Sequence, residues 1–382
     1  MKIVIAPNAF KDSISAVEAA IVIEQGIRNV MQDCETIKIP IADGGDGLVD
    51  IALHSMNGEK ISCVVRDPLL REISADFCYL PKKETAIIEM ASASGLRLLH
   101  LDDRNPMKTS TAGTGDLIRA ALDLNVRKIL VGLGGSATND GGCGMASALG
   151  VDFRDKNNLT IKPTGETLKD IRALDISRLD KRVHQTSIEA ICDVSNVLLG
   201  NKGAASVYAP QKGASAAEVK LLEQGLENIA DLIQSELKIN THKLTGGGAA
   251  GGLGAGLYSF LGAKLRPGAD VVLDLMEIDT ALEGCDLVIT AEGQIDEQTV
   301  FGKAPAAVAK RAQKRGIPCI AFAGSRSLNL NELHKAGFTA IFSICPGPVS
   351  LGKAIENVRD YLQTTTGEAL RCFISGSKGA GP

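Results

Sequence analysis

The stretch KILVGLGGSATNDGG, residues 128–142, is the most informative part of the sequence for the fold. It begins at Lys128 with a short apolar run that is typical of a buried β-strand. It continues into a turn of small and polar residues, and a helical pattern follows from Met145. A strand, a glycine-rich turn and a helix in this order predict one unit of a parallel α/β fold.

Further short apolar runs have the same form, each ending in small or acidic residues and most preceding a helical pattern. They lie at residues 3–6, 37–41, 86–90, 188–191, 287–290, 319–323 and 340–344. Because 382 residues exceed the usual span of one hydrophobic core, we expect two domains. We predict an α/β protein with a Rossmann-like parallel-sheet domain, residues 1–60 plus 285–382, interrupted by a second α/β domain, residues 61–284. The active site is expected in the cleft, beyond the carboxyl ends of the strands.

The composition is that of an ordinary folded protein, with 45% hydrophobic and 23% charged residues. A net charge of −4 and only 3% aromatic residues do not favour nucleic acid as a partner. The nine cysteines form no CxxC pair and the five histidines are isolated, so neither a zinc site nor a disulfide framework is indicated. We expect reduced thiols in a cytoplasmic protein.

No uncharged apolar stretch has the length of a membrane span, and the first residues lack the pattern of a signal peptide. We therefore expect no membrane association.

The turn after residue 133 is a candidate phosphate-binding site. Glycines let backbone N–H groups approach phosphate oxygens, and the start of the next helix favours anions. The candidate cofactor-binding residues are Gly134, Gly135, Ser136, Thr138, Asn139 and Asp140. A tight turn that only needs positive φ angles is the structural alternative; Asn139 and Asp140 beside the glycines favour function.

A second candidate site follows the apolar run at 287–290. It carries Glu292 and Asp296, two hard carboxylates that could hold Mg²⁺ or accept a proton from a substrate hydroxyl, and Lys303, which could balance phosphate charge. The alternative is a solvated loop with a capping acid.

Three further chemical groups follow strands. Ser15 and Glu18 have capping-box spacing, which places Lys11 in the loop before the first helix. Asp43 and Asp193 each follow an expected strand. Convergent acids and a lysine form a set suited to phosphoryl transfer, with Asp193, Asp296, Lys11 and Asp43 as the candidate catalytic residues.

Two common nucleotide motifs fail in context. Gly246, Gly248 and Gly251 satisfy GxGxxG, yet no buried strand precedes them, so a nicotinamide site is disfavoured and residues 246–256 are interpreted as a hinge or a binding loop. Lys303 follows Gly302 without the rest of a Walker A loop.

Taken together, these segments resemble the bacterial glycerate kinases of the first structural type. The resemblance spans nearly the whole chain and rests on APNAFKDSISA (6–16), ADGGDG (42–47), EMASASGL (89–96), GGSATNDGG (134–142), CDV (192–194), PQKGA (210–214), GAAGGLG (248–254) and TAEGQIDEQT (290–299). Asn8, Asp12 and Gln294 depart from the family pattern and could alter affinity or the position of a loop.

The resemblance implies phosphorylation of D-glycerate to 2-phosphoglycerate with ATP and Mg²⁺. Within this framework we predict that Ser136, Thr138 and Asn139 donate hydrogen bonds to the ATP phosphates. Lys11 or backbone N–H groups near the first helix would meet the glycerate carboxylate. Asp193 or Asp296 would accept the hydroxyl proton, while Glu292 or Asp43 holds Mg²⁺.

Glycerate 3-kinase activity, a non-catalytic sugar-acid or nucleotide sensor, and an NAD-linked reductase of hydroxypyruvate are the alternatives. A homodimer is left open.

Overall fold

A computed structural model of the protein describes residues 1–41, 48–300 and 302–379. Contacts between residues divide the chain into two compact units: unit 1, Met1–Gly44 with Gly268–Pro382, and unit 2, Gly45–Pro267. These boundaries differ from the expected ones near residues 60 and 285. Helix α2 (Leu48–Ser55) packs on strands of unit 2, whereas α9 (Gly268–Leu275) and α10 (Ile278–Ala281) belong to unit 1.

In the described part of unit 1, five parallel strands form one sheet in the order β13-β12-β11-β1-β2. The strands are β1 (Lys2–Ile5), β2 (Glu35–Lys38), β11 (Leu287–Ile295), β12 (Cys319–Arg326) and β13 (Ala340–Ser343). In chain order this is 2-1-3-4-5, the doubly wound arrangement of flavodoxin-like folds. The order reverses between β1 and β11, so this pair is the topological switch point.

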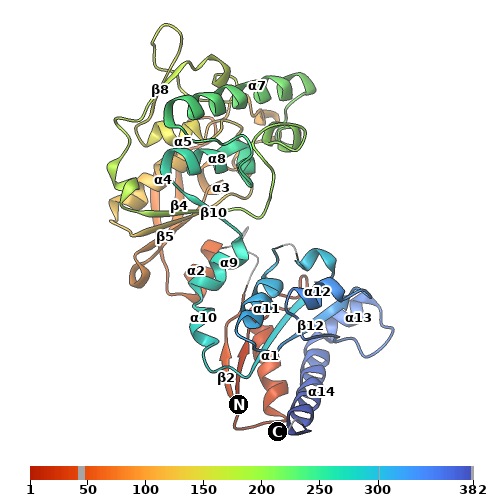
Figure 1. Ribbon diagram of the computed structural model, residues 1–382. Coiled ribbons are helices and arrows are strands. Elements are labelled where there is room, and N and C mark those ends of the chain that lie inside the picture. Colours follow the sequence, from red (N-terminus) through yellow and green to blue (C-terminus); the bar gives the residue numbers. More distant parts are fainter. Residues whose placement is uncertain (42–47, 301, 380–382) are drawn as a thin grey trace. The chain divides into compact units, whose positions relative to one another are not determined.

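Helices cover both faces of this sheet. The remaining helices of unit 1 are α1 (Ala16–Arg28), α11 (Ala304–Lys314), α12 (Asn331–Lys335), α13 (Leu351–Glu356) and α14 (Val358–Gly379). Helices α1 and α14 lie side by side (Figure 1). They share one apolar core with Ile3 and Ile5 of β1. Helices α9 and α11 share the other core with Val4, which points to the opposite face because side chains alternate along a strand.

Helix α1 begins as its sequence predicts. Ser15 is its N-cap: the Ser15 side chain accepts a hydrogen bond from Glu18 N, and the Glu18 carboxylate accepts one from Ser15 N. The loop before α1 therefore ends at Ser15. It begins after β1, which is one of the two strands at the switch point.

In the described part of unit 2, a six-stranded mixed sheet has the order β10-β9-β6-β5-β4-β3. Strands β3 (Glu59–Arg66) and β4 (Glu72–Leu80) are antiparallel to their neighbours, while β5 (Thr85–Glu89), β6 (Lys128–Gly132), β9 (Ser187–Ile191) and β10 (Lys264–Arg266) run parallel. A small separate ribbon pairs β7 (Asp152–Arg154) with β8 (Ala173–Asp175). The carboxyl ends of β6 and β9 are thus neighbours.

One large core holds the helices of unit 2 against this sheet. These are α3 (Ala91–Ser94), α4 (Ala112–Asp123), α5 (Cys143–Ala148), α6 (Ala204–Tyr208), α7 (Ala216–Leu232) and α8 (Ala249–Leu261). Ile88 and Ile129 point into this core. Ile87 and Leu130 alternate with them and are equally buried, on the sheet face where α2 packs against β4 and β5.

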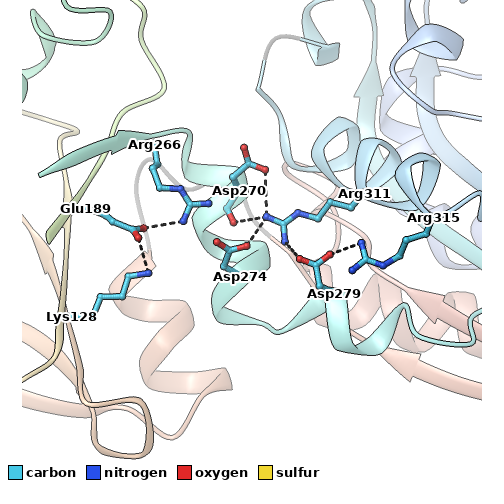
Figure 2. A network of polar contacts seen from close by, with 8 residues as sticks. All are labelled: Lys128, Glu189, Arg266, Asp270, Asp274, Asp279, Arg311 and Arg315. Atoms are coloured by element: carbon cyan, nitrogen blue, oxygen red, sulfur yellow. Dashed lines mark hydrogen bonds and ion pairs between the residues drawn. The ribbon is translucent and has the colours of Figure 1, made fainter. Parts of the chain in front are cut away.

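Each unit also contains an ion-pair network, and both are drawn in Figure 2. In unit 1, Arg311 of α11 reaches Asp274 at 2.7 Å and Asp279 at 2.8 Å, and it also contacts Asp270 at 3.4 Å. Asp279 in turn accepts Arg315 at 2.9 Å. Arg311 therefore fastens α9 and α10 to α11.

In unit 2, Glu189 joins three adjacent strands. Its two carboxylate oxygens lie 3.0 Å from Lys128 Nζ of β6 and 3.0 Å from Arg266 of β10 (Figure 2). The network therefore holds β9 in register with both neighbours.

No helix in the described ranges has the length and apolarity needed to cross a membrane. All nine cysteines lie in those ranges, and none of them is in a disulfide.

Candidate functional site

The turn between β6 and α5, residues 133–142, lies where the sequence predicted it. Gly135, Gly141 and Gly142 have φ angles of +70°, +62° and +75°, a region in which most side chains are strained. Backbone hydrogen bonds fix the turn against the segment after β5: Leu96 N donates to Gly135 O at 2.8 Å, and Ala137 N donates to Ser94 O at 2.9 Å. The glycines therefore allow the backbone conformation that these hydrogen bonds require.

Asp140 stabilises this turn from within. Its carboxylate is fully buried and accepts hydrogen bonds from Thr111 N at 2.7 Å and Thr111 Oγ1 at 2.9 Å, and from the N–H groups of Gly142 and Gly144, each at 3.1 Å. Burial raises the pKa of Asp140, and these hydrogen bonds oppose that rise. The contacts of Asp140 are thus with its own turn and with the start of α4.

Residues 246–256 pack against the turn at residues 138–142. Within α8, Ala250, Gly251 and Gly252 have φ angles of +52°, +67° and +90°. The backbone there packs directly on the turn: Gly141 N donates to Gly251 O at 3.1 Å. This segment, interpreted from sequence as a hinge or binding loop, is a kinked helix start that packs backbone on backbone against residues 138–142.

A cavity of about 420 Å³ opens beside the turn in unit 2. The strand ends β6 and β9 contribute Gly134, Gly135, Ser136 and Asp193, so the structure brings these four predicted residues together. Tyr208, Gln211, Lys212, Ala249 and Ala250 complete part of its wall.

Thr138 and Asn139 lie deeper in the turn than Gly134, Gly135 and Ser136. Both are fully buried, and neither is among the residues that line the cavity. Among the described residues, Thr138 Oγ1 and the Asn139 amide oxygen and nitrogen have no hydrogen-bond partner. Buried polar atoms in native proteins are nearly always paired, so these atoms call for a functional or structural explanation.

Lys212 is the functional candidate that sequence reasoning missed. Its side chain is 2% exposed, and Nζ donates to Ser136 Oγ at 2.6 Å and to Thr138 O at 2.7 Å. Burial lowers the pKa of Lys212 to about 7, against the opposing effect of Asp140. Lys212 lies in a short helical turn and not after a strand. The segment 210–214 was part of the family resemblance, and this was the only sequence feature that pointed to it.

In unit 1, the second group of predicted residues lies at the switch point. The ladder between β1 and β11 continues past β1, because Ala6 N donates to Ile289 O at 2.8 Å and Asn8 N to Ala291 O at 2.7 Å. The loop of Lys11 then passes close to the end of β11: a Cβ placed on Gly293 would lie 3.4 Å from Lys11 N. The Lys11 side chain is exposed.

The carboxylates predicted for β11 have defined surroundings. Glu292 is 8% exposed and forms an ion pair with Lys303 Nζ at 3.3 Å. Asp296 N donates to Thr299 Oγ1 at 3.1 Å, and Gln294 Nε2 donates to Asp296 Oδ2 at 3.1 Å. The structure thus brings Glu292 and Lys303 into contact.

Carboxylate oxygens are the donors that Mg²⁺ prefers, so Glu292 and Asp296 fit that ion chemically. Across residues 1–41, 48–300 and 302–379, no three His, Cys, Asp or Glu side chains gather as a metal site. Asp43, the remaining predicted acid, lies outside the described residues.

Comparison with known proteins identifies the family of the chain. The sequence profile of the Glycerate kinase family matches residues 3–374. A glycerate kinase of Bacillus subtilis (strain 168) is 45% identical over 365 residues, 96% of each chain. A glycerate 2-kinase of Escherichia coli (strain K12) is 39% identical over 381 residues, 100% of each chain.

The same relationship holds for a solved structure. The crystal structure of a protein described as a candidate glycerate kinase 2 from Salmonella typhimurium LT2 has a TM-score of 0.84, with 42% identity over 99% of both chains. The chain is therefore a kinase that belongs to the glycerate kinase family.

Proposed function

We propose that the protein transfers the γ-phosphoryl group of ATP to the 2-hydroxyl of D-glycerate, giving 2-phosphoglycerate and ADP. The observation that carries this proposal is the cavity of unit 2, where the glycine turn after β6 lies beside the carboxylate-bearing end of β9. The E. coli relative named glycerate 2-kinase supports the choice of hydroxyl.

The triphosphate of ATP binds along the turn after β6. Gly134, Gly135 and Ser136 line the cavity, and backbone N–H groups and a hydroxyl of such a turn can donate to phosphate oxygens. Thr138 and Asn139 belong to the same proposed phosphate site, which is supported by their buried polar atoms that have no partner among the described residues. Asp140 keeps the turn in shape.

Transfer requires a base for the acceptor hydroxyl. Asp193 or Asp296 accepts the hydroxyl proton as the glycerate oxygen forms its bond to the γ-phosphorus, and the bond from that phosphorus to the β,γ-bridging oxygen breaks as ADP leaves. Lys11 binds the glycerate carboxylate, for which its exposed ammonium group in the loop at the switch point is suited.

Glu292 and Asp296 would hold Mg²⁺, which neutralises charge on the phosphates when it is bound. Lys303 is paired with Glu292 and adds positive charge at the same end of β11. Asp43 belongs to the same set of proposed acids.

We place the enzyme in the cytoplasm, because its nine cysteines are all unpaired thiols, which is the usual state in a reducing compartment.

The test is ADP release. Purified protein is mixed with MgCl₂, ATP and D-glycerate, and ADP is measured with and without the acceptor. ADP formation that depends on D-glycerate is expected. A non-catalytic sensor would bind the ligands and release no ADP, and that result would refute the proposal.

A further inference from the structure

Lys212 lines the cavity and, when protonated, has one N–H donor more than its two hydrogen bonds use. Its ammonium group has three N–H donors, and two of them bind Ser136 Oγ and Thr138 O. Among the described residues no further hydrogen bond or ion pair of Lys212 is found, although Lys212 lines the cavity. The third donor is therefore available to a group inside the cavity.

No carboxylate of the described chain neutralises this lysine by direct contact. The charge of Asp140 raises the pKa of Lys212 through space, but the Asp140 carboxylate already accepts hydrogen bonds from Thr111, Gly142 and Gly144. A buried cation without a partner is costly, and such lysines are retained where an anion completes the site or where they shed their proton. Lys212 is 2% exposed, so its protonated form bears this cost.

We propose that Lys212 is a phosphate-binding residue of the cavity, whose ammonium group binds an oxygen of the nucleotide phosphates and takes up a proton as the phosphates bind. The assignment rests on the proposed function, which places the triphosphate along the turn that Lys212 holds through Ser136 and Thr138. A lysine ammonium group binds phosphate as a point charge.

The expected proton uptake is explained by the surroundings of Lys212. With its pKa at about 7, Lys212 is mostly neutral at about pH 8 in the free protein. Of the described acids, Asp140 raises the pKa of Lys212 and Asp193 lines the same cavity, while the pKa values of Cys192 and Tyr208 in this wall are raised chiefly by burial. A bound phosphate favours the ammonium form, so binding draws one proton from solution.

An ammonium group could equally bind the carboxylate of glycerate. The experiment therefore distinguishes a phosphate ligand from a carboxylate ligand. Titration calorimetry at about pH 8 in two buffers of different ionisation enthalpy measures proton uptake. Mg·ADP and inorganic tripolyphosphate are the phosphate probes, adenosine is the uncharged probe, and D-glycerate is the carboxylate probe. We expect uptake approaching one proton for the two phosphate probes and none for adenosine or D-glycerate.

Two variants test the residue, each first checked for folding by circular dichroism. Lys212→Met is expected to bind Mg·ADP about ten- to a hundredfold more weakly, the loss of one charged hydrogen bond, and to take up no proton. Lys212→Arg, which stays charged, is expected to keep most of the affinity and lose the proton uptake. The matched control is Lys220→Met, at an exposed position of α7, which should behave as the unmodified protein.

The assignment is overturned if Lys212→Met binds Mg·ADP as tightly as the unmodified protein, if either variant still takes up the proton, or if D-glycerate alone causes the uptake. Failure of the proposed kinase reaction can be distinguished from failure of the role assigned to Lys212. Lys212-dependent proton uptake with Mg·ADP, in a protein that forms no ADP from ATP and D-glycerate, would refute the kinase reaction and leave the role of Lys212 standing.

Discussion

Gly251 lies directly against the carbonyl group of Thr138: a Cβ on Gly251 would stand 2.0 Å from the Thr138 oxygen. The same oxygen accepts the hydrogen bond from Lys212 Nζ at 2.7 Å. The kinked start of α8 and the buried lysine therefore meet at one peptide group of the turn. A change on either side of this peptide group is expected to move the candidate phosphate site.

Gly251→Ala should disrupt this contact. The φ angle of +67° disfavours any side chain, and the added methyl group would collide with backbone that has little room to shift. We expect a loss of about 2–5 kcal/mol in the free energy of unfolding and a raised KM for ATP. The control is Gly262→Ala, because Gly262 has the same φ of +67° and nothing within 4 Å of its added Cβ. It should lose only about 1–2 kcal/mol. Equal losses in chemical denaturation of the two variants would contradict the close packing.

Arg311→Met should weaken unit 1. The Arg311 side chain is 12% exposed and is shared by Asp270, Asp274 and Asp279, so its removal takes one shared cation away from three neighbouring carboxylates. We expect a loss of about 1–3 kcal/mol, less at high salt, measured by urea denaturation.

Arg315→Met is the matched comparison for that variant. Arg315 contacts Asp279 alone within this network and is 37% exposed, so its removal should cost at most about 1 kcal/mol. A larger loss for Arg315→Met than for Arg311→Met would show that the network is centred elsewhere.

Stability should depend on pH through Lys212. Its pKa is about 7 in the folded protein and near 10.5 when exposed, so the unfolded chain binds more protons between these values. The unfolding free energy of the unmodified protein, relative to Lys212→Met, should therefore rise with pH. The expected slope is up to about 1.4 kcal/mol per pH unit above pH 7. Denaturation of both proteins at several pH values measures it. A constant difference would mean that Lys212 is not buried as a titrating group.

Removing the proposed chemical groups should slow turnover. Asp193→Asn, Asp296→Asn and Lys11→Ala are each expected to lower kcat or kcat/KM by about 10² to 10⁴, with the fold retained. Asp33→Asn is the control, because Asp33 is exposed between α1 and β2, at the opposite edge of the sheet from the switch point. If all three site variants keep near-normal kcat and KM while folding normally, the roles assigned to them are wrong.

The elements with strong local patterns could be predicted from sequence. The apolar run at Lys128 forms β6, and the capping box of Ser15 and Glu18 begins α1. Because parallel strands place their carboxyl ends at one edge, residues after β6 and β9 could be expected to meet, and Ser136 and Asp193 do line one cavity.

The remaining features depend on contacts between distant segments, which leave little local pattern. Lys212 follows no strand, and its importance lies in bonds to Ser136 and Thr138, more than 70 positions earlier in the chain. Residues 246–256 were interpreted as a hinge or a binding loop because glycine is typical of both. In the structure Gly251 is needed because its backbone approaches Thr138 too closely for a side chain. The place of α9 and α10 in unit 1 likewise depends on contacts with distant segments, namely an apolar core shared with α11 and the ion pairs with Arg311.

The most direct test of the proposed reaction identifies its product. The protein is incubated with MgCl₂, ATP and D-glycerate in the presence of enolase, which accepts 2-phosphoglycerate and not the 3-isomer, and phosphoenolpyruvate is measured with no phosphoglycerate mutase added. We predict phosphoenolpyruvate formation that depends on ATP, D-glycerate and the protein. Formation only after mutase is added would assign the 3-hydroxyl instead, and the absence of both ADP and phosphoenolpyruvate would contradict the account.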